Sequence, residues 1–305
     1  MSKPPAFLSR LAAGEILLAD GAWGTELQKL GLGTGECPEA WNVEQPERIR
    51  ELAEAYCAAG ADLLKTNTFN GTRYRLRALE HEGKVEPYNR AGAEIAREVA
   101  DRHGVFVAGC VGPTGEYAEP RGLLTRKQLY DAFAEQMRAL KAGGVDVALI
   151  ETLSDLDEAA VAAEAARDLD LPAFVTVTFH PEPGGYRTLT GIPAPEAARA
   201  LDALPAAGVG SNCGTGLADM VHILRQMRPH TAKPLVVQAN AGLPRLEGGR
   251  FVYDDSPAQM AALLPELVAA GAQLIGGCCG TTPEHIRAFR AIVDALNAGR
   301  AKGRG

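Results

Sequence analysis

The sequence predicts an α/β protein built as a single (β/α)8 TIM barrel, and two observations carry this prediction. Short apolar runs alternate with longer segments of helical periodicity along the whole chain, and roughly eight such runs are present. The chain has 305 residues and no Pro-rich or Gly/Ser-rich linker, which suits one barrel of ordinary size. We therefore expect one barrel domain over residues 1–296 and a flexible basic tail over 297–305.

The expected strands are unbroken apolar runs, as parallel strands covered on both faces require. Several of them follow a helix that ends in glycine, since glycine readily adopts the left-handed turn that closes a helix before a strand. The segments AAGADLL, AGGVDVALI and AAGAQLIGG show this pattern best. The eight runs cover residues 16–19, 62–65, 105–109, 147–150, 173–178, 208–212, 235–239 and 273–277.

A doubly wound open sheet is the alternative fold for a chain of alternating strands and helices. Such sheets commonly carry a G-x-G-x-x-G or a G-x-x-x-x-G-K-[ST] loop after the first strand. Neither loop is present here. The sequence therefore favours the closed barrel over the open sheet.

Composition and charge narrow the classes of function. The formal net charge of −7 does not suit a protein that grips a phosphate backbone, so nucleic acid is not an expected partner. The N-terminal segment lacks the apolar stretch and cleavage site of a secretory signal, and no later segment is apolar enough to span a membrane. We therefore expect a cytoplasmic protein. The six cysteines do not indicate a disulfide framework in a chain of this length, which leaves metal binding or thiol chemistry.

Polar residues follow the expected strands in a consistent way. The carboxyl ends of the strands are where barrels place their chemistry, so these residues are the candidates for the functional site. They are Asp20 after the first run, Thr66 and Asn67 after the second, Glu151 and Thr152 after the fourth, Asn212 and Cys213 after the sixth, Asn240 after the seventh, and Cys278 and Cys279 after the eighth.

Three of these residues, Cys213, Cys278 and Cys279, could meet at one ion, because the sixth and eighth strands are separated by a single strand around a barrel. Zinc suits thiolate ligands, and three protein ligands leave a fourth position for substrate. The flanking glycines would allow both adjacent cysteines to turn inward. The alternative is that the three are small buried hydrophobes, as free cysteines often are. Cys110 after the third run is a further possible ligand, and Cys37 has no assigned role.

Longer sequence motifs indicate a resemblance to a protein family that the spacing of single residues does not show. The sequence resembles the homocysteine S-methyltransferase family, and within it the homocysteine-binding module of cobalamin-dependent methionine synthase. The motifs run from residue 20 to residue 286 and so cover nearly the whole chain. They are DGAWGTELQ (20–28), ADLLKTNTFN (61–70), VGPTG (111–115), LIET (149–152), RTLTG (187–191), SNCGTG (211–216), NAGLP (240–244) and GGCCGTTPEHI (276–286).

The resemblance implies a (β/α)8 barrel with a catalytic zinc held by Cys213, Cys278 and Cys279. It also implies that Asp20 and Glu151 help to hold the amino group of an amino-acid substrate, and that Asn240 approaches the zinc when substrate is absent. Further candidate substrate contacts are Thr66, Asn67 and Asn212, although residues of these types also serve packing and loop hydrogen bonds.

The chemistry implied is methylation of a thiol, homocysteine being converted to methionine. Coordination to zinc removes the proton of a thiol whose ordinary pKa is about 8.5, and the thiolate is the nucleophile. The methyl donor stays open: it is a methylated corrinoid protein or a small molecule such as S-methylmethionine, S-adenosylmethionine or a betaine. The acceptor could also be another thiol or selenohomocysteine.

Two readings come from other classes. The chain could be a non-catalytic zinc-binding partner protein, although a structural zinc normally has a fourth protein ligand. An aldol-type barrel enzyme lacks support, because no residue stands out as a Schiff-base lysine; Lys65 at the end of the second run is the one lysine to test by borohydride trapping.

Overall fold

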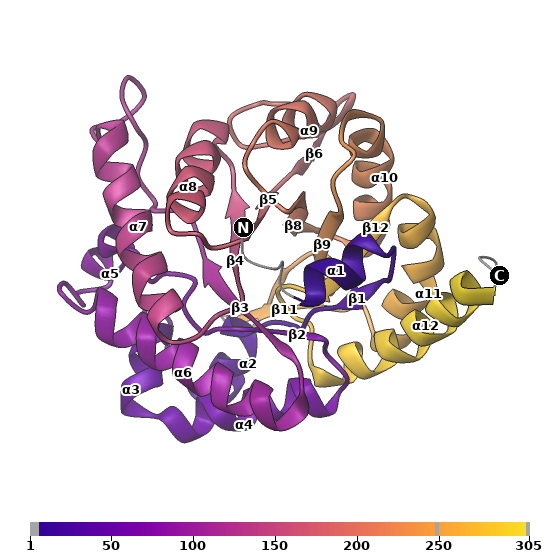
Figure 1. Cartoon of the computed structure of the whole chain (residues 1–305), viewed down its shortest axis with the longest axis horizontal. Coiled ribbons are helices and arrows are strands. Elements are labelled where there is room, and N and C mark those ends of the chain that lie inside the picture. The colour runs from indigo at the N-terminus through magenta and orange to yellow at the C-terminus, as the bar shows by residue number, and fades with distance from the viewer. Residues whose placement is uncertain (1–5, 248–249, 303–305) are drawn as a thin grey trace.

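Eight parallel strands form a ring in the computed structural model, which describes residues 6–247 and 250–302 (Figure 1). Their order around the ring is β1-β12-β9-β8-β5-β4-β3-β2, and a parallel bridge between Ala19 and Leu63 joins the two ends. The barrel prediction is confirmed, and the open-sheet alternative is wrong. The strands are β1 (Leu17–Leu18), β2 (Leu63–Lys65), β3 (Phe106–Val111), β4 (Val147–Leu153), β5 (Ala173–Val177), β8 (Gly208–Gly216), β9 (Leu235–Asn240) and β12 (Ala272–Gly277).

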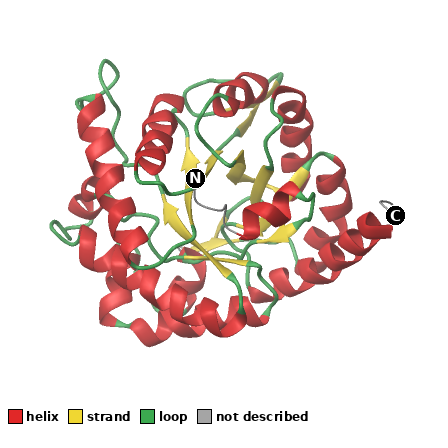
Figure 2. Ribbon diagram, in the orientation of Figure 1, coloured by secondary structure: helices red, strands yellow, loops and turns green. Residues whose placement is uncertain are grey.

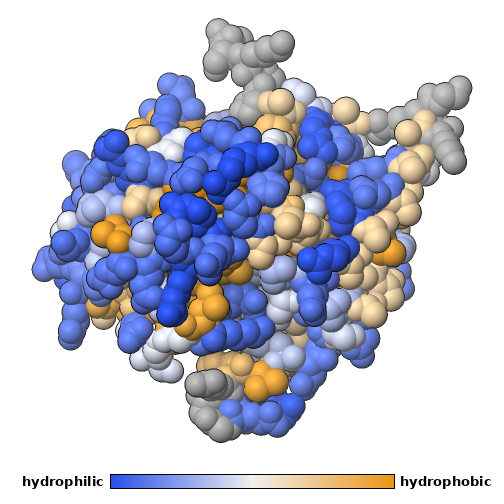
Figure 3. All heavy atoms as spheres, turned by 90° about the horizontal axis from the view of Figure 1, so that it is seen from below, coloured by the Kyte–Doolittle hydropathy of each residue, from blue (hydrophilic) through white to orange (hydrophobic). Residues whose placement is uncertain are grey.

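Helices cover the outside of the ring, one after each strand (Figure 2). In one view of the surface, hydrophilic side chains cover most of the outer face and hydrophobic ones are scattered (Figure 3). The outer helices are α4 (Pro46–Ala58), α6 (Val85–His103), α7 (Arg126–Ala142), α8 (Leu156–Asp168), α9 (Ala194–Asp202), α10 (Leu217–Met227), α11 (Pro257–Ala269) and α12 (Pro283–Lys302). Shorter helices are α2 (Gly24–Lys29), η1 (Pro38–Ala40), α3 (Trp41–Glu44), α5 (Arg73–Ala78) and η2 (Arg228–His230).

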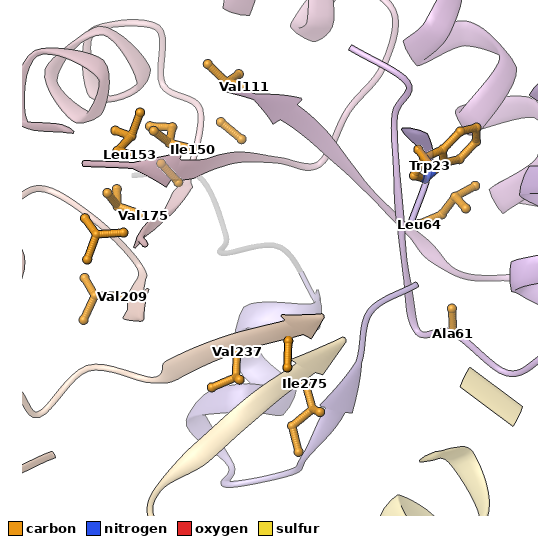
Figure 4. Close-up of a cluster of buried hydrophobic side chains, with 14 of the residues drawn as sticks. Trp23, Ala61, Leu64, Val111, Ile150, Leu153, Val175, Val209, Val237 and Ile275 are labelled. Atoms are coloured by element: carbon orange, nitrogen blue, oxygen red, sulfur yellow. The ribbon is translucent and has the colours of Figure 1, made fainter. Parts of the chain in front are cut away.

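Alternation along the strands separates two hydrophobic cores. The larger core lies between strands and helices and includes Val175, Val237 and Ile275 on strands spaced around the ring (Figure 4). Their neighbours Phe174 and Val236 belong to a second core, which fills the barrel interior. Successive side chains of a strand point to opposite faces, so a strand contributes to both cores in turn.

The same alternation determines where the side chains at the ends of the strands point. Leu63 and Leu149 belong to the interior core, and Lys65 and Glu151 lie two residues further along the same strands. A step of two residues returns a side chain to the same face, so both polar side chains point into the barrel above its apolar filling. Cys110 follows Ala108 of the interior core in the same way. The carboxyl end of the barrel interior is therefore the polar end.

The amino end of the barrel is closed by α1 (Ala6–Ala12), which lies across the ring in Figure 1. Phe7 and Leu11 of this helix are buried and belong to the interior core. The Phe7 ring packs on Phe106 and Phe174, with centroid separations of 5.2 and 5.9 Å. The N-terminal helix therefore completes the interior core from below.

The C-terminal segment differs from its prediction. Residues 297–302, expected to belong to a flexible tail, instead continue α12 to Lys302, and residues 303–305 lie outside the described part of the chain. The side-chain amide of Asn297 donates to the Ile16 carbonyl at 2.9 Å and accepts from the Ile16 N–H at 2.9 Å. Arg300 donates to the Gly14 carbonyl at 2.8 Å. These contacts attach the helix end to the chain just before β1.

Two hairpins at the carboxyl end of the barrel were not predicted. One joins β6 (His180–Glu182) to β7 (Gly185–Arg187), and the other joins β10 (Arg245–Glu247) to β11 (Arg250–Val252). Both lie between a barrel strand and the helix that follows it. They extend the rim around the polar end. Within the described residues, no helix is long and apolar enough to cross a membrane.

The contact between β8 and β9 predicts a position that tolerates no side chain. A Cβ atom on Gly210 would lie 1.8 Å from the Val236 carbonyl oxygen. We expect Gly210→Ala to lower the free energy of unfolding by about 3 kcal/mol, because the clash is with backbone and the strands must separate. Chemical denaturation measures this. Gly299→Ala is the matched control: no heavy atom lies within 4 Å of its Cβ position, so unchanged or slightly higher stability is expected. Equal stability of both variants would contradict the prediction.

Candidate metal centre and substrate pocket

Three cysteines meet at the polar end of the barrel. Cys213 lies near the end of β8, and Cys278 and Cys279 follow β12 directly. Their three Sγ atoms all lie within 4.8 Å of one another, and each residue is half-buried. Among the described residues, this is the one group of at least three cysteine, histidine or acidic side chains close enough to share an ion. Cys110 and Cys37 lie outside it.

Local backbone geometry turns these side chains toward one another. Cys213 has a φ of 58°, which is uncommon for a residue with a side chain, and the pairing of β8 with β9 shifts register between Asn212 and Gly216. After β12, Gly280 has a φ of 81° and packs against the Tyr253 ring, where a Cβ would lie 2.3 Å from Cγ. A bulge in one strand and a glycine turn after another therefore form the cluster.

The sulfur cluster fits a thiophilic divalent cation. Bonds of about 2.3 Å in a tetrahedral zinc site place two sulfurs about 3.8 Å apart, so modest side-chain rotations would suffice. Without a cation the thiols resist ionisation. A hydrogen bond with Cys278 lowers the pKa of Cys213, but the hydrogen bond with Cys279 and burial outweigh it and raise the value to about 12. The hydrogen bond with Cys213 lowers the pKa of Cys279, but the neighbouring Cys278 thiol and burial outweigh it and raise the value to about 12.

Glu151 on β4 is held by three donors. Its Oε2 atom accepts from Gln238 Nε2 at 3.0 Å and from Asn212 Nδ2 at 3.4 Å, and its Oε1 atom accepts from the Cys110 thiol. The next residue, Thr152, has a φ of 64° and donates its N–H to Asn212 Oδ1 at 2.7 Å. The carboxylate is 5% exposed and therefore keeps a fixed orientation.

Asp20 and Lys65 form a buried ion pair beside it. Asp20 Oδ2 accepts from the Trp23 indole at 2.9 Å and from the Lys65 backbone N–H at 2.9 Å, and its Oδ1 atom lies 3.5 Å from Lys65 Nζ. Burial would lower the pKa of Lys65, but the charges of Asp20 and Glu151 outweigh it and raise that pKa. Lys65 is therefore an ammonium group at neutral pH. This disfavours the aldol-type reading, which needs a neutral amine.

A pocket of about 300 Å³ opens above these residues, large enough for a ligand of amino-acid size. Of the residues that the sequence singled out, it is lined by Lys65, Thr66, Asn67, Cys110, Glu151, Thr152 and the three cysteines of the cluster. Asp20, Asn212 and Asn240 are buried but are not among its lining residues. The side-chain amide of Asn67 already donates to the Pro38 carbonyl at 2.7 Å and to Asn42 Oδ1 at 3.0 Å, which joins the two loops.

Several pocket residues were missed by sequence reasoning. Pro38 and Glu39 come from the short helix η1, which lies between β1 and α4, and Phe69 and Asn70 come from the loop after β2. Glu39 accepts from the Asn70 N–H at 2.7 Å, and burial raises the pKa of its carboxyl group. Phe69 and Asn70 are the last two residues of the motif ADLLKTNTFN, whereas no motif contains Pro38 and Glu39. Neither segment has a periodicity that predicts where a side chain points.

The fold and the cysteine cluster together define a (β/α)8-barrel protein with a three-thiol site at the carboxyl ends of its strands. The family model described as homocysteine S-methyltransferase matches residues 17–293. The chain belongs to the homocysteine S-methyltransferase family.

Individual relatives agree with this assignment. The chain is 34% identical to methionine synthase of Mycobacterium leprae (strain TN) and 33% identical to that of Mycobacterium tuberculosis (strain ATCC 25618 / H37Rv), over 94% and 91% of its length. It spans about a quarter of those proteins, 25% and 24% respectively. Among solved structures, it resembles the metallated form of the homocysteine methyltransferase MmuM from Escherichia coli, with 28% identity and a TM-score of 0.77 over 93% of this chain and 98% of that one.

Proposed function

We propose that the protein is a zinc-dependent homocysteine S-methyltransferase, which methylates the homocysteine thiol to give methionine. The observation that carries this proposal is the cluster of Cys213, Cys278 and Cys279, which lines an amino-acid-sized pocket. Family membership supports the reaction class, and the metallated form of MmuM supports a bound metal.

The three cysteines are the proposed ligands of the zinc. When bound, the ion supplies a Lewis acid that keeps the sulfur of the substrate deprotonated at neutral pH. Three protein ligands leave one position open, which favours a catalytic over a structural site and speaks against a non-catalytic zinc protein. The Oδ1 atom of Asn240 is buried without a hydrogen-bond partner, which supports the proposal that it contacts the ion or the substrate.

The remaining pocket residues bind and orient the substrate. Glu151 is the proposed contact of the substrate amino group, because its carboxylate is fixed by three donors and lines the pocket. Thr66 and Asn67 line the wall of the pocket, and Asn212 fixes Glu151 from behind. Burial of these groups excludes water and holds the sulfur in place for in-line transfer of the methyl group.

A methylated corrinoid protein is the proposed donor, because the chain resembles methionine synthases over more than 90% of its length. Among the described residues, the large hydrophobic side chains exposed by more than 60% lie in loops or hairpins that follow barrel strands: Leu123, Leu189, Leu246 and Phe251. We propose that the donor protein contacts this end of the barrel. The small donors S-methylmethionine, S-adenosylmethionine and betaine are the alternatives, as is methylation of another thiol. We propose a cytoplasmic location, which six cysteines without a disulfide among them support.

The test is a calorimetric titration of zinc-loaded protein with homocysteine in buffers of different ionisation enthalpy. We expect one site and release of about one proton at pH 7, since the free thiol has a pKa of about 8.5 and binds as thiolate. The number of protons released should fall as the pH rises through that pKa, because the free thiol is then already ionised before it binds. Protein that carries zinc but binds no homocysteine would refute the proposed function. Methyl donors are then compared by methionine formation.

A further inference from the structure

Lys65 is the one basic side chain among the residues that line the pocket. Its side chain is 5% exposed and lines the pocket. Its Nζ atom donates to the Gly277 carbonyl at 3.2 Å and lies 3.5 Å from Asp20 Oδ1. An ammonium group has three N–H donors, so these two neighbours leave one donor for a ligand.

Asp20 lies behind Lys65 as seen from the pocket. Its side chain is fully buried and is not among the lining residues. Its Oδ1 atom has no hydrogen-bond partner, so the nearby ammonium group of Lys65 is what offsets its charge. A substrate ammonium group would have to displace Lys65 to reach this carboxylate. Asp20 is therefore placed to hold Lys65 and not the ligand.

Glu151 supplies the opposite charge in the same pocket, which both residues line. Its charge acts together with that of Asp20 to raise the pKa of Lys65. A zwitterionic amino-acid head has one carboxylate and one ammonium group on the same carbon, which matches an ammonium group beside a carboxylate. Charged hydrogen bonds of this kind, formed in a buried pocket, discriminate strongly against ligands that lack one partner.

We propose that Lys65 binds the α-carboxylate of the thiol substrate while Glu151 binds its α-ammonium group, and that Asp20 acts through Lys65 as a positioning residue. This inference rests on the proposed function and narrows its substrate class to thiols that carry a free amino-acid head. It assigns Asp20 a role other than direct contact with the amino group.

The test compares two thiols that differ only in the carboxylate, homocysteine and 3-aminopropane-1-thiol, by calorimetric binding to zinc-loaded protein. We expect wild type to prefer homocysteine by about a hundredfold. In Lys65→Met, homocysteine affinity should fall by about the same factor, with 3-aminopropane-1-thiol little changed. Lys65→Arg should keep part of the preference. Lys233→Met, which replaces a lysine that lies just before β9, is the matched control and should bind as wild type does.

Asp20→Asn distinguishes direct contact of Asp20 with the substrate amino group from positioning of Lys65. It remains informative if Lys65→Met does not fold. Both thiols carry the amino group, so direct contact predicts equal weakening of both, and that result would overturn the inference. Positioning of Lys65 predicts that homocysteine loses more. Wild type that binds both thiols equally well would overturn the inference while leaving thiol methylation intact. Zinc-loaded wild type that binds neither thiol would overturn the proposed function itself.

Discussion

Cys279→Ala should leave the protein without stoichiometric zinc and lower methionine formation by about a thousandfold or more. The expected loss is large because removal of one of three thiolates leaves two protein ligands, too few for a catalytic zinc site, and the substrate sulfur then keeps its proton. Metal analysis after dialysis measures the zinc, and steady-state kinetics measure the activity. Circular dichroism and the thermal unfolding midpoint show whether the barrel is intact.

Cys57→Ala is the matched control for that experiment. Cys57 is 7% exposed and packs in the core between α4 and the barrel, and it is not part of the three-thiol cluster. This variant should retain one zinc and close to wild-type activity, with a loss of about 1 kcal/mol in unfolding free energy from the small cavity. Full zinc content in Cys279→Ala would mean that the metal binds elsewhere.

Glu151→Gln is expected to weaken homocysteine binding by about a hundredfold while zinc content stays unchanged. The amide has nearly the shape of the carboxylate but no charge, so a buried ammonium group loses its counter-charge, a loss of about 2.7 kcal/mol. The amide NH2 group would also face the donors of Gln238, Asn212 or Cys110. Calorimetry with zinc-loaded protein measures the dissociation constant.

A second thiol makes this result specific to the amino group. 4-Mercaptobutyrate lacks the amino group of homocysteine, so its affinity should be equal in wild type and Glu151→Gln. Glu158→Gln is the matched control: that glutamate is 6% exposed, accepts from Thr114 Oγ1 at 2.6 Å and lies outside the pocket. Equal weakening of both thiols in Glu151→Gln would indicate a disturbed pocket and contradict the assigned contact.

The strands could be predicted because buried parallel strands are unbroken apolar runs. The interior core and the outer core both require apolar side chains, so each strand, such as Ala173–Val177, stands out from the charged helices around it. The hairpins could not be predicted in this way. Strands such as Arg245–Glu247 are short, polar and exposed, although the two glycines between His180–Glu182 and Tyr186 were a turn signal that went unused.

The site was predictable where barrel geometry alone decides which residues meet. Cys213, Cys278 and Cys279 could be expected to converge because strand ends gather at one end of a barrel. The depth of each side chain could not be predicted: Asp20 lies behind Lys65 because the turn after β1 points its carboxylate at the Trp23 indole and the Lys65 N–H. The end of α12 was missed because a small, basic sequence gives no sign that Asn297 pairs with Ile16.

The N-terminal helix α1 closes the amino end of the barrel to ligands. Because Phe7 and Leu11 fill the amino end, the acceptor and the donor of the proposed reaction share the entrance at the carboxyl end. Under the proposed function, we expect homocysteine to bind before the donor, because a donor at this one entrance would cover the pocket. Initial-rate kinetics should then show an ordered mechanism in which the spent donor leaves before methionine. A helix that fills one end of the barrel thus leaves both reactants a single way in at the other.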